Sequence, residues 1–155
     1  MRSIRRDTKH EPLVRQLTES TNPATNRSLF PTMRELLCFA AAVGFQSKRR
    51  IPLGENTAEV DGRVWENLDS AVDMLYLVGL ASERKVEILQ PDHEDELIKI
   101  FEEYANGGLQ VLDEWLRAQG GDLYGDQAIL SALRREGLLQ DTPKPVAQAL
   151  ADVVF

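Results

Sequence analysis

The stretch that decides the fold is FPTMRELLCFAAAVGFQSKRRIPL, residues 30–53. Thr32 and Glu35 have the spacing of a capping box, in which the hydroxyl accepts from the N3 amide and the carboxylate accepts from the N-cap amide. The eight residues 36–43 that follow are all apolar. We therefore expect a helix that is surrounded by core on nearly every side and that stops at Gly44.

Helical spacing of apolar residues recurs on both sides of this stretch. The predicted segments are 11–19, 68–81, 92–119, 129–137 and a last one from Pro143 onward. The longest of them starts with clustered carboxylates, which the positive end of a helix dipole favours. Asn106-Gly107-Gly108 interrupts it, and two adjacent glycines cost about 2 kcal/mol in helix propensity, so we expect a kink or a break there.

Signals for β-structure are few. Asp61-Gly62 is the usual two-residue signal of a hairpin, and residues 86–89 have the composition of a short strand. The sequence therefore predicts a mainly α fold, a compact helical domain of about five or six helices with at most a small β-hairpin or short strands. Residues 1–10 are expected to form a flexible basic arm before a single domain over 11–155, in which 120–155 could be a C-terminal helical extension.

Positive and negative charges are unevenly distributed along the chain. Residues 1–50 carry ten Lys and Arg against four Asp and Glu, whereas residues 51–155 carry eight against twenty-one. The net charge of -7 therefore combines a basic first third with a strongly acidic remainder. Clustered charge of one sign raises the local potential by several kT. The split indicates either a basic arm for a polyanion or two halves that complement each other.

Two basic clusters are the candidates for contact with nucleic acid. Lys48, Arg49 and Arg50 follow the central helix directly, and Arg5 and Arg6 lie in the N-terminal arm. Guanidinium and ammonium groups bind phosphates through charge-assisted contacts. The alternatives are a solvated loop and arm, or pairing with the acidic half of the chain.

The motifs of the common enzyme classes are missing. The sequence contains no GxxxxGK[ST], GxGxxG, GxSxG or HExxH. Cys38 lies in the apolar run, where burial suppresses the thiolate, and His93 lies in an acidic helix start without a second His or Cys nearby. We therefore expect no enzyme activity, no metal site and no cofactor. A hydrolase built from scattered carboxylates is the alternative, with these candidates: Asp92, Glu96, Glu102 and Glu103.

Composition also predicts the compartment. One cysteine excludes an intramolecular disulfide, and together with the lack of a signal peptide it favours a reducing cytoplasm. No stretch approaches the roughly 20 apolar residues of a membrane span, so no integral membrane protein is expected.

The residues FPTMRELLCFAAAVGFQSKRRIPL, with the later EEYANGGLQVL, resemble the dnd-system-associated protein 4 family. These are small proteins encoded beside the machinery for DNA phosphorothioate modification and its linked restriction. The shared pattern is a T-x-x-[DE]-L-x-x-FAA-x-x-GF helix at 32–45, then basic residues and I/V-P-L, then an acidic-Y-A-N-G-G-L segment at 102–109. The resemblance covers about residues 5–115 and implies an accessory role in a bacterial defence system, without catalytic residues.

Two functions are compatible with these observations. The first is a non-enzymatic, regulatory DNA-associated protein whose basic residues approach phosphates while its acidic body faces other proteins of the modification-restriction system. The second is an adaptor or homo-oligomeric scaffold that docks a partner enzyme through its acidic helical surface.

Overall fold

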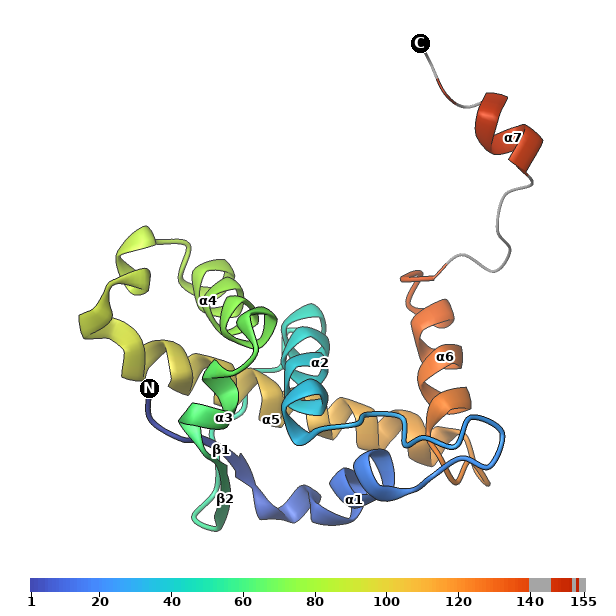
Figure 1. Cartoon of the computed structure of the whole chain (residues 1–155), viewed down its shortest axis with the longest axis horizontal. Helices are drawn as coiled ribbons and strands as arrows, with labels where there is room; N and C mark the ends of the chain where they lie inside the picture. The colour runs from blue at the N-terminus through green and yellow to red at the C-terminus, as the bar shows by residue number, and fades with distance from the viewer. Residues whose placement is uncertain (140–145, 152, 154–155) are drawn as a thin grey trace.

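The computed structural model describes residues 1–139, 146–151 and 153. The predicted mainly helical fold is confirmed (Figure 1). Its elements, in chain order, are β1 Ile4–Asp7, the 3-10 turn η1 Thr8–His10, α1 Glu11–Glu19, α2 Met33–Gln46, β2 Thr57–Val60, α3 Gly62–Glu66, α4 Asp69–Glu83, the 3-10 turns η2 Val86–Leu89 and η3 Pro91–His93, α5 Glu94–Ala118, α6 Asp126–Arg135 and α7 Val146–Ala151.

Helix α2 starts as the capping box predicts. The Thr32 hydroxyl accepts from the Glu35 amide, while the Glu35 carboxylate accepts from the Thr32 amide. The predicted stop at Gly44 is wrong, because the helix continues to Gln46. Gly44 lies instead where α2 crosses α5, and a Cβ on it would lie 2.0 Å from the Tyr104 carbonyl oxygen. The glycine permits close packing and does not end the helix.

Helix α5 is the spine of the molecule and runs beneath α2 and α4 (Figure 1). It is unbroken, so the predicted kink or break at Asn106-Gly107-Gly108 is absent. A Cβ on Gly107 would lie 1.9 Å from the Arg49 carbonyl oxygen, and one on Gly108 would lie 1.7 Å from that of Ala40. Gly108 thus allows α5 to pack closely on α2, and Gly107 allows it to pack closely on the segment after α2. These contacts outweigh the poor helix propensity of the two glycines.

The core lies between α2, α4 and α5. Trp65 of α3 is fully buried, its indole N–H donates to the Ala71 carbonyl, and its ring meets Phe101 edge-on at 5.2 Å between centroids. The other largest fully buried side chains are Ile4, Leu17, Leu36, Leu37, Leu75, Leu97, Ile98, Ile100, Leu109 and Leu112.

The small β-structure differs from the predicted hairpin. β2 pairs with β1 in antiparallel register, with Ile4 opposite Val60 and Asp7 opposite Thr57. The N-terminal residues 4–7 are therefore a strand and not a flexible arm, and the burial of Ile4 fixes them to the core. Asp61 does not form a turn, since its side chain accepts from the Arg63 amide and caps α3.

The remaining helices follow the prediction in part. α1 has the predicted bounds, and α4 and α6 cover most of their predicted segments. The predicted strand at 86–89 is the 3-10 turn η2. Pro143, the predicted start of the last helix, lies outside the described residues, and α7 is described over Val146–Ala151. Within the part of the chain that the structure describes, no helix is long and apolar enough to cross a membrane.

Candidate functional site

The two arginines of β1 have different environments because side chains alternate along a strand. Arg6 points inward, is 9% exposed, and its Nη1 lies 2.6 Å from the Glu11 carboxylate. Hydrogen bonding to Arg6 lowers the pKa of Glu11. Arg5 is on the exposed face, but its amide donates to Glu102 at 2.7 Å and its guanidinium lies 3.5 Å from the same carboxylate.

Glu102 of α5 is the centre of this N-terminal cluster. Its side chain is 1% exposed and accepts two hydrogen bonds from the Arg2 guanidinium, at 2.6 and 3.1 Å. The hydrogen bond to Glu102 raises the pKa of Arg2. Such a forked pair fixes the geometry of both partners. The N-terminal strand is therefore held against α5 by charge as well as by the burial of Ile4.

The second basic cluster is also paired with α5. Arg49 lies 2.6 Å from Glu114, and Arg50 lies 2.6 Å from Glu103 and 3.2 Å from Glu83. Burial alone would lower the pKa of Arg50, but its hydrogen bonds to the two glutamates outweigh this and raise it.

Lys48 is different from its two neighbours. It is exposed in the left-handed backbone conformation, with φ 55°, directly after α2. No ion pair of Lys48 is formed within the described residues. The structure thus places Arg5, Arg49 and Arg50 beside glutamates of α5 and buries Arg6 beside α1, and Lys48 is the one predicted contact residue whose ammonium group is open to solvent.

A buried polar network joins the segments on either side of the two clusters. Asn106 donates both amide protons, to the carbonyl oxygens of Ile51 at 3.2 Å and Pro52 at 3.1 Å. Its Oδ1 lies 3.0 Å from Nε2 of the buried His10. Because Oδ1 has no proton to give, the His10 Nε2 atom must be the donor. Sequence reasoning missed this network, since His10 fell in the expected arm and Asn106 in the expected break.

The largest excess of negative charge lies at one end of the molecule. We call residues 66–96 the acidic end; they include nine Asp and Glu and two Lys and Arg. They form α4, η2, η3 and the start of α5, which pack against one another (Figure 1). Within the described part of the chain, no ion pair is formed by Asp69, Asp73, Glu87 or Asp92.

Large apolar side chains are also exposed at the acidic end. The exposed fractions are 60% for Leu77 and 67% for Val86, and Tyr76 and Leu89 are more than one-third exposed. Exposed apolar side chains among charged residues are typical of a protein interaction surface.

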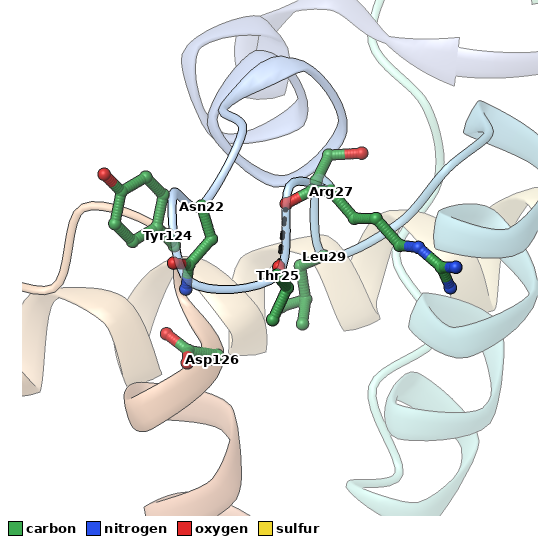
Figure 2. A pocket seen from close by; sticks show the side chains of 7 residues that line it. Asn22, Thr25, Arg27, Leu29, Tyr124 and Asp126 are labelled. Atoms are coloured by element: carbon green, nitrogen blue, oxygen red, sulfur yellow. Dashed lines mark hydrogen bonds between the residues drawn. The ribbon is translucent and has the colours of Figure 1, made fainter.

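A polar pocket of about 360 Å³ lies between the loop after α1 and the start of α6. In Figure 2 the side chains of Asn22, Tyr124 and Asp126 lie together in it, while the Arg27 guanidinium extends away from them. The Asn22 Oδ1 accepts from the Ala24 amide. The pocket is open to solvent and its polar groups are part-exposed, so it is a shallow surface feature.

The other side chains considered for catalysis or metal binding lie in separate surroundings. Burial raises the pKa of the Cys38 thiol to about 11, as its apolar surroundings predict. His93 contacts Glu96 at 3.1 Å, and Glu102 and Glu103 are occupied by arginines. Among the described residues, no group of three or more His, Cys, Asp and Glu side chains is placed to hold a metal ion.

The structure thus defines a small, mainly helical protein in which four arginines of the basic first third are paired with glutamates of α5: Arg2, Arg5, Arg49 and Arg50. The family model of DNA sulphur modification system-associated protein 4 matches residues 3–147, and the chain belongs to this family. It is accordingly an accessory protein associated with a DNA sulphur modification system. No curated protein and no solved structure shows significant similarity to it.

The family motif can now be interpreted in the structure. Its FAA-x-x-GF part supplies Ala40 and Gly44 of α2, and its YANGG part supplies Asn106, Gly107 and Gly108 of α5. These residues form the crossing of the two helices and the network around Asn106. The motif that indicated the family is therefore a packing signature.

Proposed function

We propose that this chain is an adaptor of the DNA sulphur modification system that docks a protein partner through the acidic end. The observation that carries this proposal is the internal pairing of the basic clusters. Because Arg2, Arg5, Arg49 and Arg50 contact carboxylates of the chain itself, they contribute little free positive charge. At the acidic end, Asp69, Asp73, Glu87 and Asp92 form no ion pair within the described residues, so their negative charge is free to act on a partner.

The partner that fits this surface is a protein with a basic face and an apolar centre. Carboxylates of the acidic end steer such a face toward it and suppress binding of nucleic acid at the same place. Leu77 and Val86 supply the apolar area that a stable contact requires.

The test is co-purification with each protein of the modification system. A variant with Asp73→Lys and Glu87→Lys should lose its partner, and binding of the unaltered chain should weaken as salt rises. The matched control carries Glu19→Lys and Glu55→Lys, which change the net charge equally at exposed positions outside the acidic end. Equal binding by the two variants, or no captured protein of the system, would overturn the proposal.

We also propose a second candidate function, contact with DNA phosphates at the corner formed by Lys48, Arg49 and Arg50. The specific observation in its favour is the open ammonium group of Lys48, beside two guanidinium groups whose side chains are each 37% exposed. An incoming phosphate could exchange with a rim carboxylate such as Glu114, which is half-exposed.

This second candidate is tested by fluorescence polarisation with ordinary and phosphorothioated duplexes at low salt. Binding should weaken steeply with salt, and Lys48→Glu should weaken it for all sequences alike. Lys99→Glu, at an exposed position on α5, is the control for net charge. Absence of binding to both duplexes at low salt would rule out the proposed DNA contact and leave the adaptor function.

Light scattering on the same samples measures whether the chain forms a homo-oligomer, as the scaffold alternative predicts.

A further inference from the structure

An apolar groove of about 290 Å³ lies between α2, α5 and α6, away from the acidic end. Phe39 and Val43 of α2 form one wall, Trp115 of α5 the floor, and Leu133 of α6 the other wall. Leu138, which is 48% exposed and directly follows α6, lines its end. The polar groups at its rim are Gln46, Ser47 and Glu136.

Helix α7 exposes apolar side chains as well. Its sequence, VAQALA, has no charged residue. Leu150 is 65% exposed, and Val153 just after the helix is 49% exposed. In the sequence Leu150 and Val153 have the spacing i, i+3, which is that of residues on one side of a helix. A helix of this composition is stable in water only when such a side is covered.

The position of the groove along the chain favours α7 as its occupant. Leu138 lines the groove, and α7 begins eight residues later, at Val146. Eight residues span at most about 29 Å when extended, which is several times the spacing of about 8–10 Å between packed helices. A ligand tethered this closely has an effective concentration in the millimolar range. Even a weak contact is then substantially populated.

We infer that α7 closes onto this groove of the same chain and covers it with the side that carries Leu150 and Val153. The structure has the groove open and these side chains exposed, which is the open arrangement. In the closed arrangement Leu150 contacts Phe39, Trp115 and Leu133, and α7 acts as a built-in cover. This inference does not depend on the acidic end, and the two surfaces can be tested separately.

The experiment is a disulfide crosslink in the full chain with the native thiol removed by Cys38→Ala. Gln46→Cys places a thiol on the groove rim and Ala147→Cys places one on α7, both at exposed positions. Mild oxidation should give an intramolecular disulfide at least tenfold faster than in the control pair Lys99→Cys with Ala147→Cys. Adding Leu150→Asp should abolish this difference.

Hydrogen exchange provides an independent measurement without cysteines. Backbone amides of α7 should be protected from exchange in the unaltered chain and should lose that protection in Leu150→Asp, while Ala151→Asp, which adds the same charge beside it, should have a smaller effect.

Three outcomes overturn the inference. The first is crosslinking no faster than in the control pair, and the second is amide exchange of α7 unaffected by Leu150→Asp. The third is a disulfide that forms only between two chains, because the groove then takes α7 of a second copy.

Discussion

At the scale of single residues, the side chain of Asn106 joins three segments that are far apart in the sequence. Its amide holds the carbonyl groups of Ile51 and Pro52, and its oxygen holds the imidazole of His10. Asn106 and His10 are buried, so the imidazole would lose its hydrogen bond without replacement if the amide were deleted, whereas the two carbonyl groups are only part-buried.

We predict that Asn106→Leu lowers the free energy of unfolding by about 2 kcal/mol, because it leaves the buried imidazole N–H unsatisfied and removes the donor of two part-buried carbonyl groups. Urea denaturation measures this value. The control is Asn67→Leu at an exposed position, where we expect a change within about 0.5 kcal/mol. A loss for Asn106→Leu no greater than that for the control would contradict the role assigned to the network.

His10 makes stability depend on pH. Burial lowers its pKa below the ordinary value of 6.5, and this outweighs the opposite effect of the Asn106 hydrogen bond. The nearby charges of Lys9, Asp7 and Asp113 act on it as well. Below pH 6.5 the unfolded chain therefore binds a proton that the folded chain does not, and the free energy of unfolding decreases as the pH falls.

We predict that His10→Gln makes this pH dependence shallower between pH 7 and 5.5, since the Gln amide can donate to Asn106 without titrating. Denaturation curves at several pH values measure the slope. His93→Gln, a change on the surface, should leave the slope as it is. An equal slope in all three proteins would show that His10 does not titrate differently in the folded state.

At the scale of elements, the crossing of α2 and α5 explains why this fold needs small residues at fixed positions. Backbone atoms of the two helices approach so closely that there is no room for a Cβ at Gly44 or Gly108, and the Arg49 carbonyl just after α2 leaves no room for one at Gly107. The packed helices gain dispersion contacts along the whole crossing, which offsets the higher conformational entropy of glycine in the unfolded chain.

We predict that Gly108→Ala destabilises the protein by about 3 kcal/mol, because the new methyl group would lie 1.7 Å from the Ala40 carbonyl oxygen and the helices would have to separate. Thermal denaturation checks this value. Gly120→Ala is the matched control, since no atom lies within 4 Å of its added Cβ. If both variants melt at the same temperature, the close approach of the helices is not what these glycines provide.

At the scale of the whole molecule, the charge asymmetry of the sequence becomes complementarity within the fold. The strand β1 and the segment after α2 each present cations to carboxylates of α5. These contacts differ in depth, because Glu102 is 1% exposed whereas Glu114 is 50% exposed. Buried charges that lose a partner cost far more than exposed ones.

We predict that Glu102→Gln lowers the free energy of unfolding by about 2–3 kcal/mol, since Arg2 and Arg5 lose their shared carboxylate. The loss is smaller than for a fully buried pair because water still reaches both guanidinium groups. Glu114→Gln removes an exposed partner of Arg49 and should cost less than about 1 kcal/mol. Parallel urea titrations of the two variants give the difference. Similar losses would mean that burial of the carboxylate does not determine how much the ion pair contributes to stability.

Much of the element structure could be predicted from the sequence, because its signals are local. The capping box at Thr32 and Glu35, the bounds of α1 and the long α5 helix depend on neighbours within one or two turns. The errors at Asp61-Gly62 and at residues 106–108 have a common cause. In each case the local signal, for a turn or for a break in the helix, was outweighed by a contact with a segment that is remote in sequence. Strand β2 pairs with β1, and the glycines pack against α2 and the residues just after it.

The candidate site was harder to predict for the same physical reason. The sequence by itself determined the helical class, the family motif and the amount of charge in each half of the chain, since these depend on composition and short-range spacing. Only the tertiary structure decided that Arg2, Arg5 and Arg50 meet carboxylates of α5, and that Asp69, Asp73 and Glu87 of the acidic end form no ion pair within the described residues. Electrostatic pairing depends on distances between atoms that the chain brings together over as many as 100 residues, and no local pattern encodes those distances.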